Sequence, residues 1–182
     1  VANDGSGGLI DITAGNAEIY NWVFAYGNNG SGGTINIDAD DLLLFRGQQA
    51  WLGGPGTAYW SASLLAYGTT TGGSVNIDAG NMVVIDLGNV TPESPDLVPV
   101  INVTGQLGGN GGNITINAGS ASIDDTLFAD ASGEGAGGSI DITADDLWLG
   151  GGLVANGGTG GAIVSTTTTG SLFAAGSAYV HA

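Results

Sequence analysis

The stretch Gly137-Gly138-Ser139-Ile140-Asp141-Ile142-Thr143-Ala144-Asp145-Asp146-Leu147-Trp148-Leu149 contains the pattern that predicts the fold. It consists of a Gly-Gly pair, a strand in which apolar and polar residues alternate, a turn, and a second strand. The pattern occurs five times in full, and each copy is called a repeat below. The five pairs are Gly7-Gly8, Gly32-Gly33, Gly72-Gly73, Gly111-Gly112 and Gly137-Gly138, and a poorer sixth copy begins at Gly160-Gly161.

The first strand of each repeat has one apolar side. Ile or Val stands two residues after the second glycine, Ile stands four residues after it, and Ala six. Alternate residues of a strand face the same side, so we expect this row to face a core and the Asp, Asn and Thr residues between to face solvent. The expected core row is Ile10, Ile12 and Ala14; Ile35, Ile37 and Ala39; Val75, Ile77 and Ala79; Ile114, Ile116 and Ala118; and Ile140, Ile142 and Ala144.

A second and a third apolar segment complete each repeat. Turn residues such as Gly15-Asn16 and Asp145-Asp146 are expected to separate the first strand from the second. We expect the Gly-rich corner between repeats to use positive φ angles and to let neighbouring repeats approach closely. The expected inward residues of the second strand are Ala17 and Ile19, Leu42 and Leu44, Met82 and Val84, Ala121 and Ile123, and Leu147 and Leu149.

Three short strands per repeat, stacked in register, predict an all-β parallel β-helix, or β-solenoid, of about six rungs. We expect residues 1–182 to form one such domain. Two repeats are longer than the others because of insertions at one corner, 45–63 and 85–100. Since they belong to neighbouring repeats, these insertions are expected to pack together as a side lobe, and the alternative is that each forms an extra thin rung.

The two ends of the chain resemble interior parts of a repeat. Residues 1–8 resemble residues 154–161, and residues 176–182 resemble residues 138–144. We recognise no amphipathic cap in either segment, and an uncapped stack exposes unpaired strand edges. We therefore expect the stack to continue, either in a longer polypeptide or through head-to-tail contact between identical chains. A first residue of Val1 rather than Met fits this expectation.

The composition argues against several classes of function. The chain has one basic residue, Arg46, against 17 Asp and Glu residues, and its net charge is −16. Such a chain repels nucleic acid and anionic lipid, and its sequence contains no apolar run long enough for a membrane span. We expect neither nucleic-acid binding nor membrane insertion. The complete lack of Cys excludes disulfides and thiolate chemistry.

The repeats resemble those of the filamentous-haemagglutinin type, which occur in large exoproteins of two-partner secretion systems and in related bacterial surface proteins. The resemblance lies in segments such as residues 109–120 and 135–144 and covers most of the chain, except the two insertions and the sixth repeat. It implies a right-handed β-helix shaft, secreted or on a bacterial cell surface, that works in adhesion, matrix or spacing.

Few residues suggest a ligand site. Trp51, Tyr59 and Trp60 in the first insertion could stack on sugar rings, or could pack the insertion against the shaft or a neighbouring subunit. Asp38 and Asp78 occupy one row of neighbouring repeats, which permits a calcium site, although a solvated acidic face with Asn and Thr ladders explains the same pattern. The Asp pairs that could suggest paired catalytic acids sit at turns, so we expect no catalytic residues and no cofactor.

The sequence therefore predicts a structural protein rather than an enzyme. We expect a segment or subunit of an extracellular fibre or adhesin that associates end to end. The alternative is a carbohydrate-binding surface module that uses the aromatic insertion, with surface glycans as partners. A polysaccharide-active enzyme is the third hypothesis.

Overall fold

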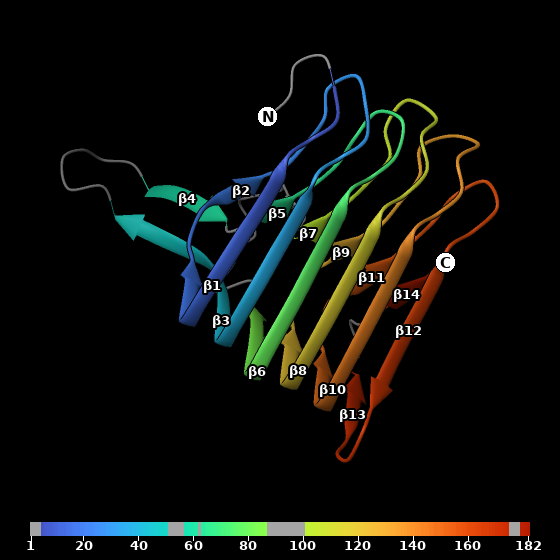
Figure 1. The fold of residues 1–182 in the computed structure, drawn as a ribbon. Coiled ribbons are helices and arrows are strands. Elements are labelled where there is room, and N and C mark those ends of the chain that lie inside the picture. The colour runs from blue at the N-terminus through green and yellow to red at the C-terminus, as the bar shows by residue number, and fades with distance from the viewer. Residues whose placement is uncertain (1–4, 51–56, 62, 87–100, 175–178) are drawn as a thin grey trace.

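The computed structural model describes residues 5–50, 57–61, 63–86, 101–174 and 179–182, and in these ranges it contains β-strands and no helix. The described residues accordingly include no helix that could cross a membrane. The strands form two sheets that face each other, and the chain passes from one sheet to the other in each repeat (Figure 1). The all-β class and the parallel strand arrangement are confirmed.

The larger sheet holds one long strand from each repeat. Neighbouring strands along it are parallel, and equivalent residues of successive repeats lie opposite each other, as Ile114 and Ile140 do. Its order is β1 (Leu9–Ile19), β3 (Thr34–Ala50), β6 (Ser74–Asp86), β8 (Asn113–Ile123), β10 (Ser139–Leu149) and β12 (Ala162–Thr167), with β13 (Leu172–Ala174) also paired to β10 and β4 (Thr57–Ser61) paired to β3.

The smaller sheet holds the third apolar segment of each repeat, and in the sixth repeat this segment is Tyr179–His181, which pairs with Gly152–Val154. The expectation that residues 176–182 begin a repeat, as residues 138–144 do, was therefore wrong. Its order is β2 (Trp22–Phe24), β5 (Ser63–Leu65), β7 (Ile101–Asn102), β9 (Leu127–Phe128), β11 (Gly152–Val154) and β14 (Tyr179–His181). Each of these strands has only two or three residues. The long strands therefore carry most of the ladder.

The first two predicted strands of a repeat form one continuous strand in the first five repeats. In β10, for example, the ladder to β8 passes from Ala144 to Asp146 without leaving the sheet. Inward residues alternate up to Ala144, and the next inward residue, Leu147, comes three positions later. Because this step is three residues instead of two, the opposite side of the strand faces inward after Ala144, while the ladder hydrogen bonds continue. The strand therefore bends at this point, where a separate turn was expected. Only in the sixth repeat do β12 and β13 form separate strands.

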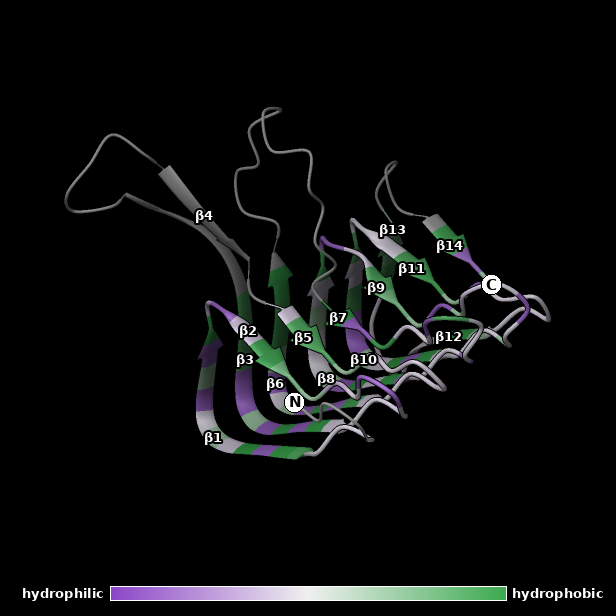
Figure 2. Ribbon diagram, turned by 90° about the horizontal axis from the view of Figure 1, so that it is seen from above, coloured by the Kyte–Doolittle hydropathy of each residue, from purple (hydrophilic) through white to green (hydrophobic). Residues whose placement is uncertain are grey.

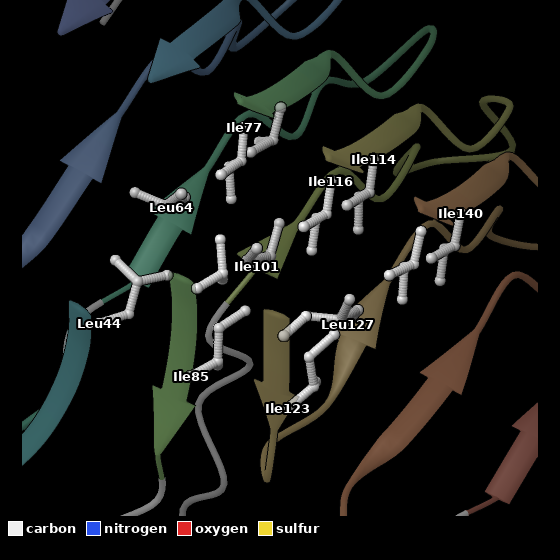
Figure 3. Packing of buried hydrophobic residues seen from close by; sticks show 14 of the residues in the cluster. Leu44, Leu64, Ile77, Ile85, Ile101, Ile114, Ile116, Ile123, Leu127 and Ile140 are labelled. Carbon is white, nitrogen blue, oxygen red and sulfur yellow. The ribbon is translucent and has the colours of Figure 1, made fainter. Parts of the chain in front are cut away.

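The core lies between the two sheets and consists of aliphatic side chains stacked on their counterparts from the next repeat. Ile35, Ile114 and Ile140 are fully buried (0% exposed), and Figure 3 shows Ile77, Ile114, Ile116 and Ile140 lying on successive strands. Hydrophobic and hydrophilic residues alternate along the long strands, as Figure 2 shows. At the ends of the stack, Ile10 and Ile163 are only partly buried.

The Gly-Gly pairs are needed for close approach rather than for unusual backbone angles. In the five full pairs φ is not positive, and among described glycines positive φ occurs at Gly108, Gly133 and Gly160. Positive φ is found instead within the Gly-rich corners that lead to the next pair, at Leu107 and Gly108 and at Gly133, so the expectation is confirmed for these corners and does not extend to the five pairs themselves. A Cβ on Gly33 would overlap the carbonyl oxygen of Gly8, and a Cβ on Gly73 would overlap that of Gly33. The second glycine of a pair thus lies against the pair of the preceding repeat.

The third repeat contains one residue more than predicted. Ala79 pairs with Ala39, but the next matched pair is Met82 with Asp41, so the register shifts within this segment. Val83 and Ile85 are fully buried, whereas Met82 is 40% exposed. The predicted inward pair Met82 and Val84 was therefore wrong, because one extra residue in a strand moves every following side chain to the opposite face.

The insertion boundaries also need correction. Ile85 was assigned to the second insertion, but it belongs to β6 and lies in the core. Ser63, assigned to the first insertion, begins β5 and is buried. The first insertion forms an antiparallel hairpin between the end of β3 and β4, which extends away from the two sheets (Figure 1), so it is not an extra rung. Most of the second insertion, residues 87–100, lies outside the described residues, and the predicted packing of the two insertions stays a prediction.

Candidate ligand and subunit contact surfaces

Two of the three aromatic residues predicted as a contact site, Tyr59 and Trp60, belong to β4 of the hairpin. Tyr59 pairs with Gln48 and Trp60 with Gly47 across the two strands of the hairpin. Trp51 lies outside the described residues, and only the backbone of Tyr59 and Trp60 is described. The structure thus brings these two residues to one hairpin strand, and their use in binding stays a prediction.

The outer face of the first half of the long strands carries a ladder of polar side chains. Asn36 donates a hydrogen bond from Nδ2 to Asp11 Oδ1 (2.7 Å), and Asn76 donates from Nδ2 to Asn36 Oδ1 (2.8 Å). Asp38 and Asp78 lie opposite each other in the neighbouring outward row. A shallow groove of about 300 Å³ runs beside these rows. Among the residues that the structure describes, no group of three or more carboxylate or imidazole side chains is placed to hold a metal ion.

The Asp pairs bind to neighbouring segments. Asp145 accepts a hydrogen bond from the Thr168 hydroxyl, and Asp146 Oδ1 accepts one from the Ser171 backbone N–H (2.9 Å). Asp125 Oδ1 accepts a hydrogen bond from the Thr126 N–H (2.7 Å). Asp145 and Asp146 therefore tie one repeat to the next, and they lie inside β10 rather than at the turn that was expected there.

A polar cluster lies beside the last strand of the smaller sheet. Asp130 Oδ1 accepts a hydrogen bond from the Asn156 N–H (2.8 Å), and His181 Nδ1 lies 3.0 Å from Asn156 Oδ1. Partial burial raises the pKa of Asp130, while the Asn156 hydrogen bond and the nearby His181 act in the opposite direction. The cluster links three successive repeats by polar contacts.

An aromatic line follows the outer side of the first two repeats. Trp22 and Phe24 meet edge to face (5.5 Å between ring centroids), and Tyr26 stacks on Tyr67 (4.9 Å, 12° between planes). Burial, followed by the Tyr26 phenol, raises the pKa of Tyr67. Trp22, in the first repeat, is 52% exposed. The aromatic line is therefore accessible to solvent at its Trp22 end.

A second aromatic pair, which the sequence analysis did not single out, lies at the other end of the long sheet. Trp148 and Phe173 stack with ring centroids 4.2 Å apart and an angle of 12° between planes. They border a groove of about 310 Å³ on the outer face of β8, β10 and β13. The available signal was an aromatic residue at an outward position of the second strand in consecutive repeats.

Both ends of the described stack present apolar side chains. Ile10 in β1 and Ile163 in β12 are only partly buried, and Val180 in β14, whose partner Leu153 is buried, is 58% exposed. Within the described ranges, β1 pairs only with β3 and β14 pairs only with β11. Unpaired backbone groups and exposed apolar residues therefore coincide at the same edges.

Comparison with known proteins identifies no relative of this chain. No protein-family model, no curated protein and no solved structure matches this chain.

Proposed function

We propose that this chain is a segment or subunit of an extracellular or cell-surface fibre or adhesin. In this proposal it forms a right-handed parallel β-helix of about six rungs, similar to the shafts of filamentous-haemagglutinin-type exoproteins, with no enzymatic activity. The observation that carries the proposal is that, among the described residues, unpaired ladder edges coincide with partly buried core residues at both ends of the stack. Ile10 and Ile163 are half-buried, whereas their counterpart Ile140 is completely buried.

End-to-end addition of a further repeat explains this difference. If the register of the long sheet continues across a junction, Ile163 of one copy lies beside Ile10 of the next, just as Ile140 lies beside Ile163 within the chain. The strand edges then gain ladder hydrogen bonds, and the exposed aliphatic groups leave water. The added repeat belongs either to an identical chain or to a continuing polypeptide.

Electron microscopy of material purified from the native source, with mass analysis under denaturing conditions, tests the proposal. We expect filaments that dissolve under denaturing conditions into chains of about 18 kDa, the mass of this polypeptide being 17.8 kDa. Filaments of much heavier chains would indicate covalent continuation. Discrete monomers at high concentration would contradict the head-to-tail form of the proposal.

A pair of matched variants locates the contact. Ile10→Lys places a charge in the junction, while Thr13→Lys places the same charge on the exposed outer side of the same strand. We expect Ile10→Lys to abolish filaments and Thr13→Lys to retain them, with the β-sheet circular dichroism of both unchanged. At the other end, Ile163→Lys and the exposed Val164→Lys form an equivalent pair. Equal assembly of all four variants would argue against these edges as the junction.

The alternative proposal is a carbohydrate-binding surface module. It is supported by the position of Tyr59 and Trp60 on a hairpin strand that extends from the sheets. Replacing Trp51, Tyr59 and Trp60 by Ala distinguishes the two proposals. Lost glycan binding with normal filaments supports the module, and lost filaments with normal folding indicate that the hairpin contacts a subunit.

A further inference from the structure

The indole of Trp148 is held in a fixed orientation by two neighbours. Phe173, which occupies the same row in the next repeat, covers one face of the ring at a centroid distance of 4.2 Å. The indole Nε1 donates a hydrogen bond to Asp124 Oδ1 (3.0 Å), which belongs to the preceding repeat. A ring anchored at one face and at its only polar atom loses little further conformational freedom when a ligand binds.

Gly150 makes this arrangement possible. A Cβ at this position would overlap Asp124 Oδ1 and would lie 3.3 Å from Trp148 Nε1. The absence of a side chain thus allows the Asp124 carboxylate to reach across from its own repeat and bind the indole. Gly150 is therefore part of the support for the indole.

The second face of Trp148 is turned toward a small residue. Ser122, Trp148 and Phe173 are successive members of one row across β8, β10 and β13. Because the two rings are stacked and nearly parallel, the face of Trp148 opposite Phe173 is directed toward the Ser122 side of the row. Ser122 has too small a side chain to cover an indole, and Trp148 is 42% exposed.

Polar groups lie along the other wall of the same groove. The groove is bordered by Ser120, Asp146 and Ser171 on one side and by Ser122, Trp148 and Phe173 on the other, with Ala121 and Leu147 between them. It crosses three strands, or roughly 10 Å at the usual strand spacing. An aromatic wall opposite hydroxyl and carboxylate oxygens matches a pyranose ring, which has an apolar C–H face and hydroxyl groups at its rim.

We propose that the free face of Trp148 binds a pyranose unit of a neutral glycan, with Asp146, Ser120 and Ser171 bonding to sugar hydroxyls. The glycan is neutral because the groove is lined by the Asp146 carboxylate and by no basic side chain, in a chain of net charge −16. Uronic-acid or sulfated glycans would be repelled. Carboxylates are good acceptors for hydroxyl donors.

The free face of Trp148 lies away from the proposed fibre junction, whereas Ser171 and Phe173 belong to the last repeat. Ser122 and Trp148 lie on β8 and β10, which have partner strands on both sides. It also differs from the hairpin that contains Tyr59 and Trp60, which extends from β3. A stack that grows by addition of repeats at its ends would leave the free face of Trp148 accessible.

Binding of defined oligosaccharides tests the proposal. The probes are cellohexaose, mannohexaose and xylohexaose, with hexagalacturonic acid as the acidic counterpart, measured by isothermal titration calorimetry up to 10 mM sugar. We expect at least one neutral hexasaccharide to bind and the acidic one not to bind. Trp148→Ala should weaken binding at least about tenfold, whereas Trp22→Ala, which removes another exposed indole outside the groove, should leave it unchanged.

A variant that blocks the free face tests whether the sugar binds to this face of Trp148 rather than elsewhere on the ring. Ser122→Leu retains Trp148, Phe173 and Asp124 but fills the space beside the free face, so it should also weaken binding at least about tenfold. Circular dichroism checks the fold of each variant, and filament formation should be normal in both. The proposal is overturned if none of the neutral hexasaccharides binds, if the acidic one binds more tightly, or if folded Ser122→Leu binds like the parent chain.

Discussion

Gly72 lies so close to the carbonyl oxygen of Val103 that a methyl group on its Cα would overlap this oxygen. The two residues begin and end the inner part of the same repeat. The Val103 oxygen also accepts a hydrogen bond from the Gly112 N–H (2.8 Å), so it is held by the next repeat and cannot move away freely. The corner is therefore closed by three backbone segments with no room for a side chain.

We expect Gly72→Ala to destabilise the chain by at least about 3 kcal/mol, because overpacking against fixed backbone cannot be relieved by a rotamer change. Gly8→Ala is the matched control, since a Cβ there meets no atom within 4 Å. It should be neutral or slightly stabilising. Urea unfolding followed by circular dichroism measures both, and equal midpoints would contradict the role assigned to the glycine.

Gly8→Ala should nevertheless affect assembly. Within the chain, the second glycine of a pair lies against the carbonyl of the preceding pair, as Gly33 does against Gly8. In a continued stack, Gly8 would take the position of Gly33 and would lie against the last pair of the preceding copy. We expect Gly8→Ala to prevent filaments of a chain that folds normally, and Gly15→Ala, whose Cβ would make only an ordinary contact at 3.7 Å, to allow them. Electron microscopy of both variants provides the comparison.

The extra residue in β6 can be tested by charge. Val83 is fully buried and Met82 is 40% exposed. Val83→Lys should unfold the chain or lower its stability by several kcal/mol, since a buried unpaired charge is strongly unfavourable. Met82→Lys should change the stability by roughly 0.5 kcal/mol or less. The reverse order of the two urea midpoints would restore the inward assignment of Met82.

The Asn36 side chain acts both as a donor to Asp11 and as an acceptor from Asn76. Asn36→Asp removes the donor and places a second carboxylate beside Asp11, so we expect a loss of about 1 kcal/mol. Part of this loss should be recovered in 1 M NaCl, because salt screens exposed charges. Asn28→Asp, the same change in an exposed loop, is the control. Identical salt responses of the two variants would count against the ladder.

The raised pKa of Asp130 predicts how the stability of the folded chain depends on pH. Burial raises its pKa above the ordinary value of 3.8, so the folded chain favours the neutral acid. The folded state then binds a proton more tightly than the unfolded state, and the contribution of Asp130 to stability is lost as pH rises from 3.8 through the raised value. Asp130→Asn keeps a neutral acceptor for the Asn156 N–H. It should be more stable than the parent at pH 7 and equally stable at pH 3. A less stable variant at pH 7 would contradict this sign.

The repeated residues allowed most of the architecture to be predicted. Inward Ile residues at fixed spacing define both the strand and its partner, because equivalent positions such as Ile114 and Ile140 lie side by side. The merging of two strands was not predictable from alternation, since the odd step from Ala144 to Leu147 is compatible with either a turn or a bend. At Ala79, the residue types Gly, Asn and Met gave no sign that one of them was additional.

The candidate site was less predictable. Aromatic residues in an insertion are conspicuous in a sequence, whereas Trp148 looks like one outward residue among others. Its setting depends on Phe173 and Asp124, which lie one repeat after it and one repeat before it. Such a site can be recognised only once the register of the strands is known. The small size of Ser122 becomes significant only because the register places it beside the indole.

The in-register stacking of equivalent residues has a consequence for how such a chain can change in length. Residues 112–137 span one interval between successive Gly-Gly pairs, and their Ile, Ile and Ala row lies against Ile, Ile and Ala of the next repeat and Val, Ile and Ala of the preceding one. Deletion or duplication of a whole interval would leave matching surfaces on either side of the splice. Gene segments encoding such units can therefore be lost or copied without disturbing the interior, while the outer side chains diversify.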